Sequence, residues 1–247
     1  MHIRDKVALI TGGTHGIGYE TSLSLAREGA KICIVARNVK NISIIDKLNE
    51  MDAVFFLIAA DLSREDECKR VVGEVFEQFK SIDILIHCAG SGAPGSLLNG
   101  ARNTWYSAFD IHVHAIFHLC LAAVPYMEEA GEGAIILISS SAGLRGVKNA
   151  LAYAVAKGAI PQFTRALALE LSDKKIRVNC VSPGVIRTRF QDYLTDDQVR
   201  NNIENRIPLR MEGTPRNVAS GICVLIENDF ITGENLVIDG GMTMRIV

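Results

Sequence analysis

The chain has 247 residues, of which 48% are hydrophobic and 22% are charged, and its formal net charge at pH 7 is −2. This length and composition predict one α/β domain over residues 1–247, and the weak net charge excludes a basic field for nucleic acid or an acidic membrane surface. The six cysteines lack a Cys-x-x-Cys spacing, only four apolar residues follow the N-terminal segment, and no apolar run approaches a membrane span. We therefore expect a cytoplasmic protein with buried, reduced cysteines and with neither nucleic-acid nor membrane partners.

Short apolar runs alternate with helical stretches along the chain. Near-continuous apolar strands between amphipathic helices are typical of a parallel sheet buried on both faces. The pattern predicts a doubly wound α/β fold of about seven parallel strands, with ligands bound at the carboxyl ends of the strands. The expected strands are residues 7–11, 31–36, 54–60, 84–88, 134–139, 177–182 and 236–239.

A glycine-rich turn, Thr11-Gly12-Gly13-Thr14-His15-Gly16-Ile17-Gly18, follows the first strand and opens a helix. In this context Gly12 allows a tight turn, Gly16 lets the backbone approach a pyrophosphate, and Gly18 permits close packing of the helix on the strand. A glycine pattern alone is weak evidence, because glycines also mark ordinary turns. Its position between a strand and a helix favours a dinucleotide site.

The end of the second strand bears on the choice of dinucleotide. A carboxylate there would bind the ribose hydroxyls and repel a 2′-phosphate, but this chain has Ala36 followed by Arg37. A guanidinium pairs with phosphate in a bidentate fork, and His15 adds a second basic group. The sequence favours NADP, with NAD as runner-up; the alternative for Arg37 is an ordinary surface arginine.

Tyr153 and Lys157 lie four residues apart, and Ser140 lies thirteen residues before Tyr153. Positions i and i+4 share one face of a helix, so the phenol and the ammonium can approach the same small volume. A neighbouring cation favours the phenolate and moves a tyrosine pKa from ~10 toward the neutral range. Ser140 would hydrogen-bond the substrate oxygen. Without the other motifs, the same spacing would fit a solvated helix face.

The order of glycine turn, serine and Tyr-x-x-x-Lys resembles the classical short-chain dehydrogenase/reductase family over essentially the whole chain. The resemblance implies a single-domain Rossmann-like fold and an oxidoreductase that interconverts a ketone and a secondary alcohol. It implies that Tyr153 is the general acid in reduction, that Lys157 also holds the nicotinamide ribose, and that Ser140 polarises the carbonyl. The cofactor-binding set that it implies is Gly12, Thr14, His15, Gly16, Ile17, Gly18, Arg37, Asn38, Asp61, Leu62, Ala89, Gly90, Tyr153, Lys157, Pro183, Gly184, Ile186 and Thr188.

The chain departs from the family pattern in two places. His87-Cys88 stands where the family has two asparagines, and His112 stands where it has a catalytic asparagine that holds a relay water. His112 could carry a proton relay, preserve the helix geometry, or leave the relay impaired. A titrating relay predicts an extra pH dependence of the rate near neutrality. No metal is expected, because only His114 and His118 could share a ligand face.

The sequence does not decide the secondary structure of two segments. Residues 109–114 alternate like a strand, but the apolar stretch runs on to Pro125, and the family resemblance favours a long buried helix. Residues 189–212 are polar, with weak periodicity, and fit a mobile lid or a solvated helical pair equally well. Asp61 is either an acceptor for the adenine amino group, as the resemblance implies, or a strand-end cap.

Substrate and assembly follow only from the resemblance. Family members that reduce acyl-carrier-protein substrates dock that acidic partner with basic residues before the fifth strand, where this chain has Glu128, Glu129 and Glu132. A small or medium carbonyl, sugar or polyol-type substrate is therefore favoured. A 3-oxoacyl-carrier-protein reductase and a non-catalytic nucleotide-binding protein remain the alternatives. The C-terminal strand and residues 242–247 resemble segments that pack against a neighbouring subunit, which predicts a homotetramer, with a dimer as runner-up.

Overall fold

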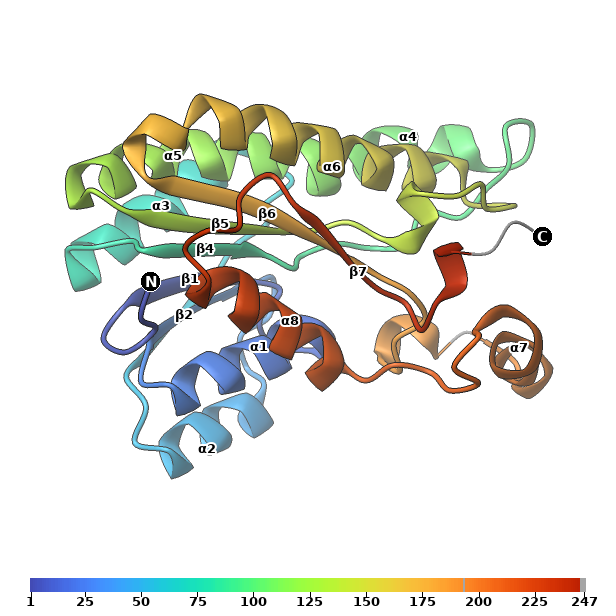
Figure 1. Cartoon of the computed structure of the whole chain (residues 1–247), viewed down its shortest axis with the longest axis horizontal. Helices are drawn as coiled ribbons and strands as arrows, with labels where there is room; N and C mark the ends of the chain where they lie inside the picture. The colour runs from blue at the N-terminus through green and yellow to red at the C-terminus, as the bar shows by residue number, and fades with distance from the viewer. Residues whose placement is uncertain (193, 245–247) are drawn as a thin grey trace.

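The computed structural model describes residues 1–192 and 194–244, and a seven-stranded parallel sheet runs through them in the order β3-β2-β1-β4-β5-β6-β7 (Figure 1). Each expected strand lies within one residue of an observed one, which confirms the predicted sheet. The strands are β1 Val7–Thr11, β2 Lys31–Ala36, β3 Phe55–Ala59, β4 Ile84–His87, β5 Gly133–Ile138, β6 Ile176–Pro183 and β7 Asn235–Ile238.

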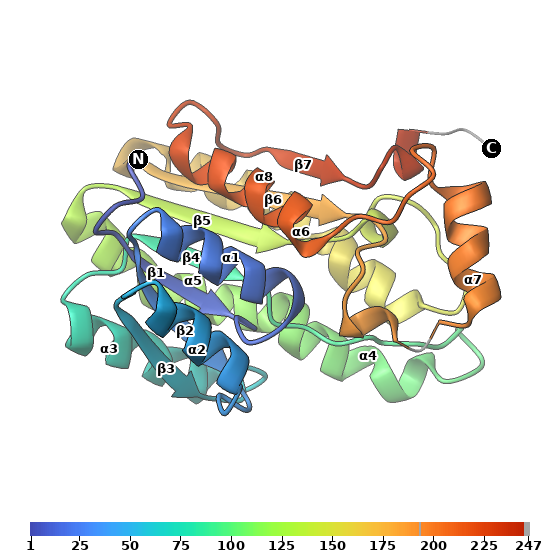
Figure 2. The same ribbon diagram turned by 90° about the horizontal axis from the view of Figure 1, so that it is seen from below.

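Helices cover both faces of the sheet. Figures 1 and 2 show α1, α2 and α8 on one face and α3, α5 and α6 on the other. The helices are α1 Gly16–Arg27, α2 Ile42–Glu50, α3 Glu65–Phe79, α4 Ala101–Phe109, α5 Ala115–Ala130, α6 Leu151–Glu170, α7 Asp196–Asn201 and α8 Pro215–Glu227.

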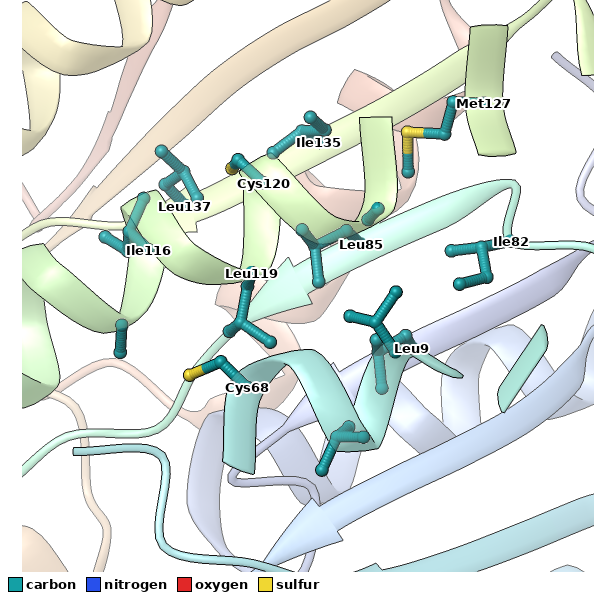
Figure 3. Packing of buried hydrophobic residues seen from close by; sticks show 14 of the residues in the cluster. Leu9, Cys68, Ile82, Leu85, Ile116, Leu119, Cys120, Met127, Ile135 and Leu137 are labelled. Atoms are coloured by element: carbon teal, nitrogen blue, oxygen red, sulfur yellow. The ribbon is translucent and has the colours of Figure 1, made fainter. Parts of the chain in front are cut away.

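The sheet is buried on both sides because successive strand residues point to opposite faces. Leu9 and Leu85 join the core beneath α3 and α5 (Figure 3), whereas their neighbours Ile10 and Ile86 join the core beneath α1 and α8. This two-sided burial explains why the strands are continuous apolar runs rather than alternating ones.

Residues 101–130 form one helical run, interrupted by the π-helical turn Asp110–His114. The expected helix is therefore confirmed, but it continues past Pro125 to Ala130, and Phe117 and Leu121 on it are at least half exposed. The run is also long and apolar enough to cross a membrane, with a mean hydropathy of 1.5, contrary to the expectation that no such run exists. Its buried side packs against α3 and the sheet, and core helices of soluble proteins share these properties.

The segment 189–212 lies beyond the carboxyl ends of the strands, where Figure 1 shows α7. It contains a short 3-10 turn, Arg189–Gln191, then α7 and the π-helical turn Asn202–Arg206, so the described part follows the helical alternative. Residue 193 lies outside the described residues. A bridge between Ile186 and Gly213 joins the two ends of the segment.

Candidate active site

The glycine turn packs against two other loops at the carboxyl edge of the sheet. Gly12 (φ +66°) and Gly16 (φ +55°) adopt the left-handed conformation that favours glycine. A Cβ on Gly12 would lie 2.8 Å from the amide nitrogen of Ala89, and one on Gly16 would lie 3.2 Å from Cγ2 of Thr188. The loops after β1, β4 and β6 therefore meet at this turn.

A hollow of about 310 Å³ opens at the N-terminus of α1. The side chain of His15, at the N-cap, makes no capping hydrogen bond, so the first amide groups of α1 and the positive end of its dipole can face an anion. Burial and then the nearby Arg189 cation lower the pKa of His15. Arg189, the N-terminus of α1 and the close-packed glycines fit a dinucleotide pyrophosphate, although Glu20 also lines the hollow and Arg187 is paired with Glu212. The lining residues are His15, Gly16, Tyr19, Glu20, Arg187, Thr188, Arg189 and Pro215.

The loops after β2 and β3 carry the residues expected to contact the adenosine half. Arg37 and Asn38 are exposed directly after β2. The Asp61 carboxylate accepts hydrogen bonds from Ser63 Oγ (2.8 Å) and the Ser63 amide (3.1 Å). These bonds, with a smaller effect of the Arg37 cation, lower the pKa of Asp61. Asp61 therefore caps this turn, and its role as an acceptor for the adenine amino group stays a prediction.

The loops after β6 and β7 are held to each other. A Cβ on Gly184 would lie 2.7 Å from the Cα of Asp239, whose carboxylate accepts hydrogen bonds from the Gly241 and Thr243 amides (2.8 and 2.7 Å). Pro183 ends β6, and its neighbours Ile186 and Thr188 continue toward the glycine turn. The expected cofactor-binding residues of this region therefore share one edge with the glycine turn.

The serine run after β5 separates into different environments. Ser139 is buried, and its Oγ donates to the Lys157 carbonyl oxygen (2.8 Å). Ser140 is half-buried, and its Oγ accepts from the Ala142 amide (3.1 Å). A Cβ on Gly143 would lie 2.6 Å from the Lys157 carbonyl carbon, so this turn rests directly on α6. Ser139 is engaged in the core, so of these two serines Ser140 remains the candidate.

Tyr153 and Lys157 lie on one face of α6, with Lys157 Nζ 5.9 Å from the centre of the Tyr153 ring. The Nζ atom donates to the carbonyl oxygen of Ile138 (2.6 Å), and Lys157 is only 5% exposed. Within the described chain, no carboxylate forms an ion pair with it. Burial accordingly lowers the pKa of Lys157 to about 7.

The two histidines that replace family asparagines are both buried next to this lysine. His87 Nε2 lies 2.9 Å from the Ile111 carbonyl oxygen, and burial lowers the pKa of His87 to about 4. Burial also lowers the pKa of His112 well below its ordinary value, and the Lys157 cation lowers it further. His112 is thus uncharged near neutrality, which opposes a titrating relay and favours its role as a packed helix residue.

The remaining histidines of this helical run give no metal centre. His114 is exposed and pairs with Asp110 (3.1 Å). Among residues 1–192 and 194–244, no three His, Cys, Asp or Glu side chains gather closely enough to hold a metal ion.

Phe190 is a site residue that the sequence analysis did not single out. Its ring centre lies 6.0 Å from that of Tyr153, and a Cβ on Gly92 would lie 3.8 Å from the Phe190 ring. Phe190 is therefore placed to form one wall of a substrate pocket. The only sequence signal was an aromatic residue within a polar segment.

Comparison with known proteins identifies the family. A family profile described as enoyl-(acyl carrier protein) reductase matches residues 12–243. The chain belongs to the short-chain dehydrogenase/reductase family. A 3-oxoacyl-(acyl-carrier-protein) reductase of Chlamydia muridarum is 33% identical to it over 242 residues, covering 96% of this chain and 97% of the relative. This match confirms the resemblance that the motifs predicted.

Solved structures of this family agree with the fold. Levodione reductase has a TM-score of 0.93 at 26% identity, covering 98% of this chain and 99% of its own. L-Sorbose reductase from Gluconobacter frateurii, complexed with NADPH and L-sorbose, has a TM-score of 0.92 at 28% identity and covers 100% of both chains. As a member of the short-chain dehydrogenase/reductase family, the chain is an oxidoreductase of Rossmann-like fold.

Proposed function

We propose that this oxidoreductase interconverts a ketone and a secondary alcohol, with NADP(H) as cofactor and Ser140, Tyr153 and Lys157 as the reacting set. One observation carries the proposal: a phenol lies beside a buried lysine that has no carboxylate partner in the described chain. Burial of an unpaired cation destabilises the fold, and such a group at the ligand-binding edge of a parallel sheet is a candidate for catalysis.

Each of the three residues has a distinct role in the proposed reaction. When bound, the nicotinamide supplies or takes the hydride. The Ser140 hydroxyl donates a hydrogen bond to the substrate carbonyl oxygen. The Tyr153 hydroxyl gives its proton to that oxygen in reduction and removes it in oxidation. The Lys157 ammonium favours the phenolate and binds the ribose hydroxyls.

The cofactor proposal rests on the loops at the carboxyl edge. The hollow at the N-terminus of α1 would receive the pyrophosphate, and Arg37 with Asn38 would receive the 2′-phosphate of NADP. Neither position 36, where β2 ends, nor position 37 carries an acidic residue. The related L-sorbose reductase was solved with NADPH, which supports the same preference.

For the substrate, we favour a small or medium ketone, sugar or polyol-type alcohol. Glu128 forms an ion pair with Lys174, which offsets one of the basic charges near the region that would dock an acidic carrier protein. Levodione and L-sorbose reductases are similar in structure. A 3-oxoacyl-carrier-protein reductase is the second candidate, because the Chlamydia relative has that name.

We further propose a cytoplasmic homotetramer, with a dimer as runner-up. A tetramer with dihedral symmetry needs two self-complementary surfaces, and exposed large apolar side chains lie on helices α4–α6 and on the α8–β7 region. These are Tyr106, Phe117, Leu121, Val155 and Leu169, and then Val224, Phe230 and Val237. Of the expected contact tail, residues 245–247 lie outside the described residues. Light scattering at micromolar concentration tests this, and a monomer contradicts it.

A panel of ketones, sugars and a 3-oxoacyl carrier-protein substrate, each with NADPH and NADH, tests the reaction by loss of reduced-nicotinamide absorbance. We expect turnover of a free ketone or sugar with NADPH. Turnover of the carrier-bound substrate alone would establish the second candidate. Tight NADPH binding without turnover of any carbonyl would instead indicate the non-catalytic nucleotide-binding protein.

A further inference from the structure

Two buried histidines connect the end of β4 and the loop after it with the π-helical turn, one reaching from each side. His87, the last residue of β4, contacts the carbonyl oxygen of Ile111 with its Nε2 atom (2.9 Å). His112, the next residue of the turn, contacts the carbonyl oxygen of Ser91 with its Nε2 atom (2.8 Å). Each imidazole thus binds backbone close in sequence to the other histidine.

The hydrogen bonds around His87 determine where its proton lies. A carbonyl oxygen can only accept, so Nε2 carries the hydrogen, and in the neutral ring Nδ1 is then the acceptor. Thr11 Oγ1 lies 3.0 Å from Nδ1 and also accepts from the Ala89 amide (3.1 Å), so with Nδ1 as an acceptor the Thr11 hydroxyl donates to His87. This chain of bonds is complete when the ring is neutral.

His112 has a similar protonation. Its Nε2 lies 2.8 Å from the Ser91 carbonyl oxygen and 3.4 Å from the Ser91 amide nitrogen. The ring nitrogen cannot donate and accept at once, and the shorter contact has the geometry of a real hydrogen bond, so Nε2 donates. The buried Nδ1 atom makes no hydrogen bond within the described chain.

The His112 ring fills the space between the cofactor loop and the phenol. A Cβ on Gly90 would lie only 2.4 Å from Cε1 of His112, so the ring lies directly on the Gly90 backbone. The ring centre is 5.5 Å from that of Tyr153, in an edge-to-face arrangement at 86°. A movement of His112 would therefore change the packing of both Gly90 and Tyr153.

We propose that His87 and His112 are positioning residues: a reciprocal pair of neutral imidazoles that fixes the Gly90–Ser91 backbone against the Tyr153 ring. The inference deepens the proposed function and depends on it for its kinetic consequence. The groups that face His112 are Lys157, Tyr153 and His87. Burial and the positive charges of Lys157 and His87 favour the neutral form of His112, whereas a Tyr153 phenolate would act in the opposite direction. We expect the first group of effects to dominate, so that the pair stays neutral through the working pH range and adds no titration of its own.

Kinetics of His87→Ala, His112→Ala and the double variant test the pairing. Loss of one positioning hydrogen bond should lower kcat about tenfold, with little change in KM for the ketone. The double variant should lose little more than the worse single variant, because each histidine acts through the other. His112→Asn restores a donor and should recover part of the loss, with the wild-type pH profile. His114→Asn, an exposed position of the same turn, is the control and should match wild type.

A second readout is independent of turnover. In nitrogen-15 NMR spectra of the wild-type protein, both rings should show the Nε2–H neutral form from pH about 5.5 to about 8.5, a range in which a free histidine titrates. NADPH affinity of His112→Ala should fall several-fold. Titration of either ring in that range, additive losses in the double variant, or an equal loss in His114→Asn would overturn the proposal. If wild type reduces no ketone, the proposed function fails, while the NMR and binding results still decide the pairing.

Discussion

The two ends of the sheet hold their lysines in opposite ways. At the amino end, Lys6 Nζ contacts carboxylate oxygens of Glu132 (2.5 Å) and Asp83 (3.4 Å), and the hydrogen bond with Glu132 raises the pKa of Lys6. At the carboxyl end, Lys157 Nζ binds only a backbone carbonyl oxygen among the described contacts, and burial lowers the pKa of Lys157 to about 7. One cation is stabilised by the fold, and the other is destabilised by it.

The comparison distinguishes a charge that stabilises the fold from a charge that destabilises it at the proposed site. Asp83 also accepts from the Val7 amide (2.8 Å) and Ser81 Oγ (3.1 Å), so the amino-end network is nearly satisfied. The carboxyl end instead holds a poorly compensated cation, Lys157, and two neutral histidines close to it. Buried groups that weaken the fold are retained where they act on a ligand. Substitutions at the carboxyl end should therefore change chemistry or binding, and those at the amino end should change stability alone.

The largest effect is expected at Tyr153. Tyr153→Phe keeps the ring between His112 and Phe190 and removes the proton, so kcat should fall at least about a hundredfold. NADPH affinity measured by fluorescence titration and the unfolding midpoint should stay close to wild type. Turnover above about a tenth of wild type would show that another group supplies the proton.

Lys157→Met sharpens the comparison because it should lower turnover and stabilise the fold. The folded-state pKa of about 7 lies below the ordinary lysine value of 10.5, so the unfolded chain holds the proton more tightly between these values. The full penalty of the cation is present below pH about 7 and disappears as pH rises toward about 10.5. After loss of the Ile138 hydrogen bond, a net gain of roughly 2–4 kcal/mol is expected at neutral pH.

Denaturant unfolding of Lys157→Met and wild type at several pH values measures this gain. The difference in unfolding free energy should shrink steadily from neutral to alkaline pH. A Lys157→Met protein that is less stable than wild type at neutral pH would mean that the cation is well solvated in the fold, and the contrast between the two lysines would be lost.

Tyr153 and Lys157 also show how far the sequence determines the site. Strands buried on both faces leave continuous apolar runs, and the i, i+4 spacing places Tyr153 and Lys157 on one helix face, so both were predictable. The π-helical turn was not, because the alternating residues 109–114 follow neither a strand nor a regular helix. The contacts of His87 with Ile111 and of Phe190 with Tyr153 join distant positions, and depend on how the backbone turns between them.

Arg37→Ala should affect ligand affinity without affecting stability. Its guanidinium is exposed after β2, so no folded contact of consequence is lost. Loss of a charge-assisted bond to the 2′-phosphate costs about 1.5–3 kcal/mol, or roughly ten- to a hundredfold in NADPH affinity, with little change for NADH. Calorimetric titration with both cofactors measures this. Equal losses for the two cofactors, or a wild-type preference for NADH, would refute the proposed choice of NADP.

The smallest effect is expected at the amino end, where Asp83→Ala should change stability alone. The substitution leaves the Val7 amide without its side-chain acceptor and removes one of the two carboxylates beside Lys6, which should lower the unfolding free energy by about 1–3 kcal/mol. Lys6 keeps its Glu132 partner, and its raised pKa means that this stabilisation is lost only in strongly alkaline solution, above the ordinary lysine pKa. The deficit of Asp83→Ala should thus be nearly constant around neutrality, where the effect of Lys157→Met changes with pH. Urea unfolding measures the change in stability, and kcat/KM measures any change in catalysis. A loss of kcat/KM in a folded Asp83→Ala protein would show that the amino end of the sheet affects catalysis, and that the two ends are not separate in function.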